Sequence, residues 1–448
     1  MANTYLSRTM NKAENTDSDK KFSYSAWIKR SSLSDACIIE GYYSSTFHSQ
    51  LYFDSNANLT LNCASGTSGA AFQIVTNRKF RDTSAWYHIV VAIDTTQGTA
   101  SDRAKIYING VQETSFSGAT YPNQNTSHQF NRNGNTAYLG RRTGGGVGLY
   151  FGGLMSHIHT TIGYTYDASA FGKTDTTTGE WEAKTSPSVT YGTNGFFILK
   201  DGNSVTDQSS NSNNFTVGGG TLTKTEDCPS NVFATFNSLN SWGDTVLTNG
   251  NTTAGNTGTS AGHVSSTIHM NSGKWYMEFN VNTHLTGYSA PMFLLAGTGV
   301  FQNLQVGWNA SGDGSYGIGS NAKKITDGVV SNASFSDLNA GNKVQIAYDA
   351  DAGKAWFGIN GAYLDSGNPT TAANPYFTTT KLQNNDVSLI ILGYNGNAMS
   401  ANFGNGYFGT TAITTNSGNG YSGAEGSSKF NYTVPTGYSA LNTKGLNL

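Results

Sequence analysis

Apolar and polar positions alternate with a period of two along much of the chain. In KFSYSAWIKR (21–30), the apolar residues Phe22, Tyr24, Ala26 and Ile28 occur at every second position, which is typical of a strand with one buried face. Comparable segments occur at 50–54, 59–63, 71–77, 86–94, 104–110, 136–142, 154–164 and 194–201, and again at 273–282, 290–297, 304–309, 314–320, 343–349, 354–361, 387–395 and 399–404. Their short spacing predicts antiparallel strands of a sandwich or jelly roll.

Two distant stretches, 89–112 and 344–364, follow the same succession. In each, an apolar strand ends in an aspartate (Asp94, Asp349), a polar turn follows, and a second strand closes on an Asn-Gly pair. Asn-Gly favours the type I′ turn, because both of its residues accept a positive φ. Each stretch therefore predicts three consecutive antiparallel strands. We interpret the repetition as two similar sandwiches and assign no chemistry to the aspartates.

The composition changes at DCPSNVFATFN (227–237), and a new series of strands follows. We predict an all-β fold with two antiparallel, jelly-roll-like β-sandwich domains and a C-terminal tail. The predicted division is 1–226 for the first sandwich, 227–408 for the second, and 409–448 for a Gly/Ser/Asn-rich segment with the tail.

Composition agrees with strands and excludes several partners. Charged residues make up 12% of the chain, against about 25% in an average globular protein, and aromatic residues make up another 12%. The net charge of −2 gives no reason to expect a nucleic-acid partner. No apolar run is long enough to predict membrane insertion, and the N-terminus lacks the apolar core of a signal peptide. We therefore expect synthesis in a cytoplasm without export by a standard signal.

The second block resembles a SPRY domain. The resemblance rests on GKWYMEF, VGW, DGSYGIG, KVQIAYDADAGKAWFGINGAYL and a late NFG, in that order. It implies a two-layered antiparallel sandwich that binds proteins through loops at one end and is not an enzyme. On that basis Asp313, Tyr316 and Asn321, in and around the polar turn 309–323, are candidate ligand-binding residues.

The first block resembles laminin-G-like and concanavalin-like jelly rolls. The residues that carry this resemblance are FSYSAWIKR, AWYHIVVAID, AKIYINGV and FGGLMSHIHTTIGY. Such jelly rolls include carbohydrate-binding modules and glycanases.

The whole chain also resembles a group of marine bacteriophage proteins. The motifs occur in the succession YLSRT, FGK…GEWEAK…YGTNGFFI, a D-x-P-S-N-x-F-A-T joint, the SPRY-like block and PTGYSALNT. This resemblance implies a virion structural protein, made in the host cytoplasm: a tail fibre, a tail-associated adhesin or a capsid appendage. Its partners would be other virion proteins and a host-surface glycan or protein, and we expect a homo-oligomer. The sequence leaves open which part of the virion and which receptor.

The alternative function is a free carbohydrate-binding module or a glycanase. Glycoside hydrolysis needs two carboxylates on either side of the scissile bond. The nearest pair is Glu180 and Glu182, while Glu40 and Glu278 each stand alone. We therefore predict no enzymatic activity and assign no catalytic residue.

Metal sites are weakly indicated. His157 and His159 alternate on one predicted strand and would share a face, but no third ligand is visible. Asp94, Asp102 and Asn109 could contribute oxygen ligands to calcium, although no dense acidic loop occurs. We expect no cofactor and no metal, with calcium as the alternative.

Arginine pairs are the remaining candidates. Arg141 and Arg142, in GRRTGGG, could engage an anionic glycan, and so could the basic residues of TNRKFRD (76–82). Solvated turn charges are the other interpretation. We retain Arg141 and Arg142 as candidate ligand-binding residues.

Overall fold

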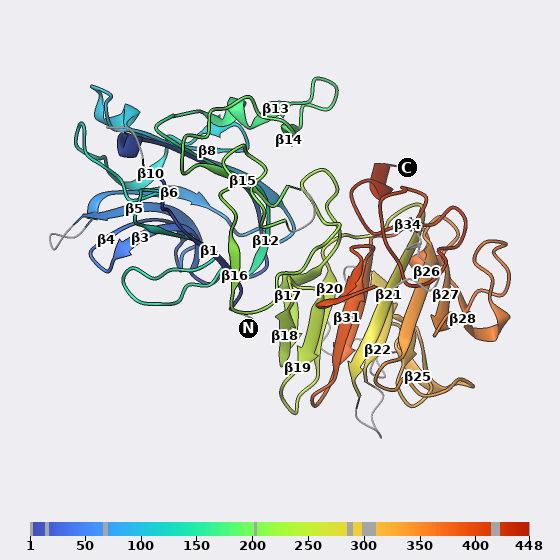
Figure 1. Cartoon of the computed structure of the whole chain (residues 1–448). Helices are drawn as coiled ribbons and strands as arrows, with labels where there is room; N and C mark the ends of the chain where they lie inside the picture. The colour runs from blue at the N-terminus through green and yellow to red at the C-terminus, as the bar shows by residue number, and fades with distance from the viewer. Residues whose placement is uncertain are drawn as a thin grey trace. The chain divides into compact units, whose positions relative to one another are not determined.

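A computed structural model of the chain describes residues 3–13, 18–65, 70–200, 204–284, 290–297, 311–413 and 422–447. The chain divides into two compact units, Met1–Lys224 and Thr225–Leu448, here called the first and the second unit. Both are built from antiparallel sheets (Figure 1). Helices among the described residues are three-residue 3-10 turns, and none of them is long and apolar enough to span a membrane. The prediction of an all-β fold is confirmed.

The first unit packs two large sheets against each other. In its described part, the eight-stranded sheet has the order β10 (Phe116–Thr120), β6 (Ala70–Lys79), β5 (Asn58–Ser65), β4 (Phe47–Phe53), β3 (Ala36–Ser44), β11 (Thr136–Leu139), β1 (Tyr5–Thr9), β16 (Thr216–Gly218). The six-stranded sheet has the order β15 (Phe196–Ile198), β12 (Gly153–Ile162), β2 (Lys21–Arg30), β7 (Trp86–Asp94), β8 (Ala104–Ile108), β9 (Val111–Gln112). A hairpin, β13 (Gly172–Thr174) and β14 (Trp181–Ala183), and the turns η1 (Ser18–Lys20), η2 (Ala100–Asp102) and η3 (Ala168–Ala170) complete the described elements.

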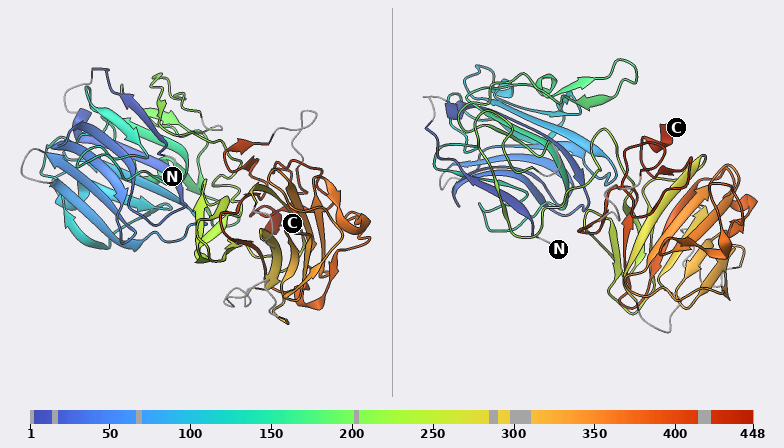
Figure 2. Two further views of the ribbon diagram at one scale, coloured as in Figure 1. Left: turned by 90° about the horizontal axis from the view of Figure 1, so that it is seen from below. Right: turned by 45° about the vertical axis from the view of Figure 1, so that its right-hand side comes forward.

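The second unit repeats this two-layer plan (Figure 2). Its described seven-stranded sheet has the order β17 (Phe236–Gly243), β20 (Gly262–Ser266), β30 (Val387–Gly393), β22 (Met292–Gly297), β23 (Tyr316–Gly319), β24 (Lys323–Thr326), β25 (Val329–Asn332). The facing sheet has the order β18 (Thr245–Thr248), β19 (Thr253–Asn256), β31 (Ala398–Asn402), β21 (Lys274–Thr283), β26 (Lys343–Asp349), β27 (Lys354–Ile359), β28 (Ala362–Tyr363), with β29 (Phe377–Thr378) on β27 and β34 (Ser439–Ala440) on β21. The hairpin β32 (Tyr407–Phe408) and β33 (Thr411–Ala412) and the turns η5 (Leu364–Ser366), η6 (Thr380–Leu382) and η7 (Gly445–Asn447) stand outside the sheets. The predicted strand 304–309 lies outside the described residues.

Alternation along the strands explains where the core lies. On β21, Met277 and Phe279 point into the space between the two sheets of the second unit, while Glu278 between them points the other way. We call the side of a sheet that faces away from its partner sheet the outer face. On β3 of the first unit, Ile39 packs in the core and Glu40 lies on the outer face. Burying one face of each sheet is the main favourable contribution to the stability of a sandwich.

The two Asn-Gly stretches fold as predicted. Strands β7, β8 and β9 are consecutive antiparallel neighbours, and so are β26, β27 and β28. Asn109 and Gly110 have φ of 48° and 83°, and Asn360 and Gly361 have φ of 51° and 93°, the positive values that a type I′ turn requires.

The C-terminal segment belongs to the second unit. Phe430, Tyr438 and Ala440 pack with Tyr276 and Trp356 in a small cluster on the outer face of the β21 sheet. β34 pairs with β21 in parallel. Part of the residue range that the sequence suggested as a tail therefore packs on this outer face.

Candidate functional site

Arg141 lies over two tyrosine rings on the outer face of the eight-stranded sheet. Its guanidinium carbon is 4.4 Å from the ring centroid of Tyr5 and 4.9 Å from that of Tyr138. These tyrosines lie on β1 and β11, which pair antiparallel, and their ring centroids are 6.0 Å apart. Tyr150 adds a third ring 6.3 Å from Tyr5. All four side chains are partly exposed, and we call them the Arg141 platform.

A buried carboxylate holds the loop that carries Arg141. Glu40 is fully buried, and its two carboxylate oxygens accept hydrogen bonds from the backbone N–H groups of Thr143 (2.5 Å) and Gly144 (2.7 Å). The Gln50 amide donates to Glu40 at 2.7 Å and to the carbonyl of Gly144 at 2.9 Å. Burial raises the pKa of Glu40, and these hydrogen bonds act against the rise. The loop 140–148 is therefore fastened across the sheet directly after Arg141.

Gly144 has to be glycine for this contact. A Cβ atom there would lie 2.4 Å from His48 Nδ1 and 2.9 Å from the Glu40 carboxylate, closer than real Cβ contacts. The glycine-rich run after Arg142 thus serves close approach to the sheet. Arg142 itself donates from Nε to the carbonyl of Gly146 at 3.3 Å and takes part in the turn of the loop. The structure places Arg141, and not Arg142, on the tyrosines.

The Arg141 platform has the chemistry of a polar-ligand surface. Partly exposed tyrosine rings offer flat apolar faces that can stack on the C–H face of a sugar, and their hydroxyls can hydrogen-bond. Arg141 Nη2 donates to Thr143 Oγ1 at 3.2 Å, while Nε is buried without a hydrogen-bond partner. A guanidinium held over rings is oriented before a ligand arrives, which lowers the entropic cost of binding.

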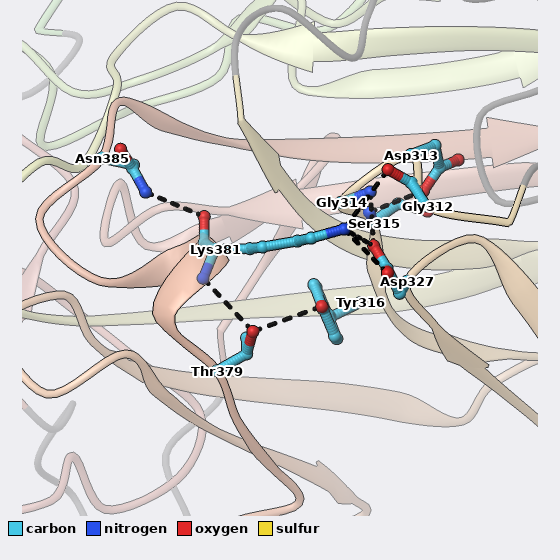
Figure 3. A network of polar contacts seen from close by, with 9 residues as sticks. All are labelled: Gly312, Asp313, Gly314, Ser315, Tyr316, Asp327, Thr379, Lys381 and Asn385. Atoms are coloured by element: carbon cyan, nitrogen blue, oxygen red, sulfur yellow. Dashed lines mark hydrogen bonds and ion pairs between the residues drawn. The ribbon is translucent and has the colours of Figure 1, made fainter.

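The candidate residues of the second unit do not form one site. Asp313 accepts from the backbone N–H and the hydroxyl of Ser315, at 2.7 and 2.6 Å, which closes a local turn. Next to it, Asp327 accepts from Lys381 Nζ at 2.6 and 2.7 Å and from Gly314 N at 2.9 Å (Figure 3). The hydrogen bond to Lys381, followed by the bond from Gly314, lowers the pKa of Asp327. This network ties β23, β24 and η6 together.

Tyr316 and Asn321 differ from their predicted setting. The strand predicted at 314–320 is present as β23 (Tyr316–Gly319), so the described part of the predicted turn, 311–323, is divided by a strand. Tyr316 is only 6% exposed and packs edge-on against Phe377, so it is a core residue and unavailable to a surface ligand. Asn321 lies beyond the other end of β23, with φ of 55° and its N–H donating to Asp337. Alternation over a four-residue strand turned Tyr316 inward and separated Asp313 from Asn321.

The three calcium candidates do not lie together, because Asn109 is at the opposite end of the β7–β8 pair from Asp94 and Asp102. Asp94, at the end of β7, accepts from Thr96 and Gln97, and Asp102 pairs with Lys105 at 2.9 Å. Asn109 lies at the far end of β8 and accepts from His88 N at 2.8 Å. Each of these side-chain oxygens therefore already has a protein partner. Nowhere in the described ranges do three or more His, Cys, Asp or Glu side chains gather as a metal-ion cluster.

The two histidines of β12 flank an irregularity. The pairing of β12 with β2 shifts register between Ser156 and His159, and His157 has φ of 49°. His159 is buried, stacks on Phe197 at 3.8 Å between ring centroids and shares a hydrogen bond with the Tyr191 hydroxyl at 3.0 Å. Burial lowers the pKa of His159 well below its usual value, so the ring is neutral at pH 7 and packs as an aromatic residue.

Glu180 and Glu182 lie on the β13–β14 hairpin. Glu182 pairs with Lys173 at 3.5 Å, and both side chains are substantially exposed. Trp181 between the two acids points back to the six-stranded sheet, where its indole donates to His88 Nδ1 at 2.8 Å. The hairpin is thus anchored by its tryptophan, with the two acids at its surface.

The sequence analysis did not name Tyr5 and Tyr138 as candidate binding residues. Their positions in YLSRT and TAYLGRR indicate the outer face, because Leu6, Ala137 and Leu139 are the core-facing neighbours. The pairing of β1 with β11, more than 120 residues later, has no local signal.

Comparisons with known proteins support the fold of the first unit. Residues 4–160 match the laminin G model of the concanavalin A-like lectin/glucanase superfamily, so this part of the first unit is similar to a concanavalin-like jelly roll. No curated protein has a significant sequence match to the chain.

Three solved structures are similar to parts of the chain. The SPRY domain of human HERC1 is 13% identical over 37% of this chain and 96% of its own, with a TM-score of 0.30. A heptameric SAP-like pentraxin from Limulus polyphemus is 19% identical over 36% and 71%, with a TM-score of 0.27. The CBM40 of a Ruminococcus gnavus IT-sialidase, bound to α2,3-sialyllactose, is 12% identical over 34% and 79%, with a TM-score of 0.25. At these scores the similarities carry no functional argument.

Proposed function

We propose that the chain is a non-enzymatic binding protein whose first unit recognises a glycan on the Arg141 platform. The observation that carries the proposal is the partly exposed guanidinium held 4.4 and 4.9 Å from two tyrosine rings. Tyrosine rings can stack on a sugar ring, and the oriented guanidinium can bind an anionic group on the same sugar. This combination suits a sugar that bears an anionic group. The concanavalin-like match over residues 4–160 supports the same ligand class.

The setting that we propose is a bacteriophage particle. The chain would be made in the host cytoplasm and built into a virion as a tail fibre, tail-associated adhesin or capsid appendage, in a homo-oligomer. Support comes from the motif order that spans the chain, from YLSRT to PTGYSALNT. Host-surface glycan is the proposed receptor, and other virion proteins are the remaining partners.

Binding to an array of acidic and neutral polysaccharides tests the first proposal. Arg141→Ala in the full chain should weaken binding about tenfold or more, because it removes both the charge and the stacking contact. Lys173→Ala is the control, since Lys173 is an exposed basic residue of the same unit outside both the platform and the basic stretch 76–82. Equal affinity of the Arg141 variant and the wild type would contradict the proposal.

Two further measurements test the setting and the absence of catalysis. Immunogold microscopy and proteomics of purified particles should find the protein in virions, and its absence there would refute the virion role. Incubation with the bound polysaccharide should release no reducing ends. Release that is lost in Glu180→Gln or Glu182→Gln would establish the alternative, a glycanase.

A further inference from the structure

A polar cavity of about 290 Å³ lies on the outer face of the β21 sheet in the second unit. Strand residues Asn280, Asn282, Lys343 and Ser400 contribute to its lining from three neighbouring strands. The β32–β33 hairpin contributes Phe408 and the residues that follow, and the C-terminal segment contributes Asn431. None of these residues belongs to the Arg141 platform.

The polar side chains of this lining are fixed by a chain of hydrogen bonds. Asn280 Nδ2 donates to Asn282 Oδ1 at 2.7 Å, and Asn282 Nδ2 donates to Ser400 Oγ at 2.8 Å. Ser400 and Thr253 share a hydrogen bond of 2.8 Å, and Asn249 Nδ2 donates to Thr253 at 3.0 Å. The chain orients its amides before any ligand binds, which is the arrangement of a preorganised polar site.

Lys343 brings an uncompensated charge to the cavity. It lies directly opposite Asn280 in the β21–β26 pairing, so both side chains are on the outer face. Its ammonium group is 5.8 Å from the Phe408 ring centroid, and no carboxylate of the described residues forms an ion pair with it. At the other end of the same two strands, Lys274 is paired with Asp349 at 3.5 Å. One lysine of this strand pair is thus neutralised by the protein and the other faces a cavity.

We propose that this cavity binds a single acidic sugar residue, with its carboxylate on Lys343 and its hydroxyls on Asn280, Asn282 and Asn431. Amides donate and accept, as a ring of hydroxyl groups requires, and the ammonium group supplies a charge-assisted bond to the carboxylate. The volume is at the lower end of ligand pockets, which suits one sugar unit and excludes an extended oligosaccharide within it. This site is additional to the Arg141 platform and does not depend on the function proposed for it.

Titration of the full chain with D-glucuronate and, as the neutral comparator, D-glucose tests the proposal by ligand-observed NMR at up to about 10 mM sugar. Wild type should bind glucuronate in preference to glucose. Lys343→Met keeps the aliphatic stem and removes the charge, so it should weaken glucuronate binding about tenfold and abolish the preference. Asn282→Ala should weaken the binding of both sugars. Lys323→Met, on β24 of the opposite sheet, is the matched control and should bind as wild type.

The outcomes separate this site from the first unit. Binding of glucuronate that persists in Arg141→Ala and falls in Lys343→Met supports the cavity. Failure to bind glucuronate, an undiminished preference in Lys343→Met, or loss of binding in Arg141→Ala alone would each overturn it. The Lys343 and Asn282 variants should unfold in urea with the same midpoint as the wild type. Equal midpoints show that a loss of binding is not caused by a loss of folded structure.

Discussion

Glu40 in the first unit and Glu278 in the second unit occupy matching situations. Each lies fully buried on the outer face of a sheet and accepts hydrogen bonds from two consecutive backbone N–H groups of a segment that crosses that face. Each also accepts from a side-chain amide on a neighbouring strand, Gln50 or Asn402. Both units therefore use one buried carboxylate as a clamp for a chain segment without regular structure.

The two units differ in which part of the outer face each clamped segment leaves uncovered. In the first unit, the loop 140–148 crosses the sheet and leaves Tyr5 and Tyr138 partly exposed under Arg141. In the second unit, the C-terminal segment buries the aromatic side of the face, with Tyr276 and Trp356, and the polar side becomes a cavity. The comparison teaches that the covering segment, more than the sheet, determines which side chains of an outer face remain exposed.

Removing the Glu278 carboxylate should have the largest effect. Glu278→Ala leaves the N–H groups of Asn431 and Tyr432 and the hydroxyl of Tyr276 without their acceptor in a buried place. We expect a loss of about 3–5 kcal/mol in the free energy of unfolding, measured by urea denaturation. Asp386→Ala, an exposed carboxylate of the same unit, is the control and should change little. A loss below about 1 kcal/mol would show that the segment is held by Phe430 and Tyr438 alone.

Glu40→Ala should destabilise the first unit by a smaller amount, about 2–4 kcal/mol. Glu40 accepts from Thr143 N, Gly144 N and the Gln50 amide, whereas Glu278 accepts in addition from the hydroxyl of the fully buried Tyr276, so the Glu40 variant leaves fewer donors unsatisfied. The same variant should accelerate hydrogen exchange at Thr143 and Gly144 and weaken glycan binding, because Arg141 is no longer held on its tyrosines. Unchanged exchange at both amides would break the parallel between the two clamps.

The pH dependence of stability sharpens the comparison further. Burial raises the pKa of Glu278 to about 7, against an ordinary value of 4.5, so the folded protein binds more protons than the unfolded chain between these values. The free energy of unfolding of the wild type, measured relative to that of Glu278→Gln, should therefore fall as the pH rises from about 4.5 to about 7. The total decrease should be about 1–3 kcal/mol. Denaturation of both proteins across this range measures it. A difference that is constant or grows with pH would contradict the assigned shift.

The Asp327–Lys381 pair should show the smallest effect. It resembles the clamps in holding two segments together, but both partners are largely in water, where an ion pair stabilises little. Lys381→Met should leave the urea midpoint of unfolding unchanged within error at 0.15 M salt. At this salt concentration the Debye screening length is about 8 Å, so the attraction between exposed charges is weakened. A shift as large as that of Glu40→Ala would mean that this exposed network acts as a third clamp.

Much of the fold was predictable because its signals are local. The period-two alternation in KFSYSAWIKR and the two Asn-Gly hairpins depend only on the alternation of side chains and on backbone sterics within a few residues. Those signals predicted strands β2, β7–β9 and β26–β28, with Asp94 and Asp349 at strand ends. Arg141 was likewise named as a candidate, together with Arg142, from the glycine-rich run that follows the pair in the sequence.

The candidate sites themselves were decided by tertiary structure. Tyr5 meets Arg141 only because β1 joins the sheet beside β11, and Glu278 meets Asn431 across 153 residues of chain. Asp313, Tyr316 and Asn321 show the opposite case, because the strand already predicted at 314–320 places Tyr316 in the core and lies between Asp313 and Asn321, so local alternation alone argues against a shared site. The sequence by itself determined which residues form strands and which face of each strand is apolar, since both depend on short-range alternation. Which outer face is covered, and by which segment, followed only from long-range pairing, because burying a carboxylate is tolerable only where distant N–H groups arrive to satisfy it.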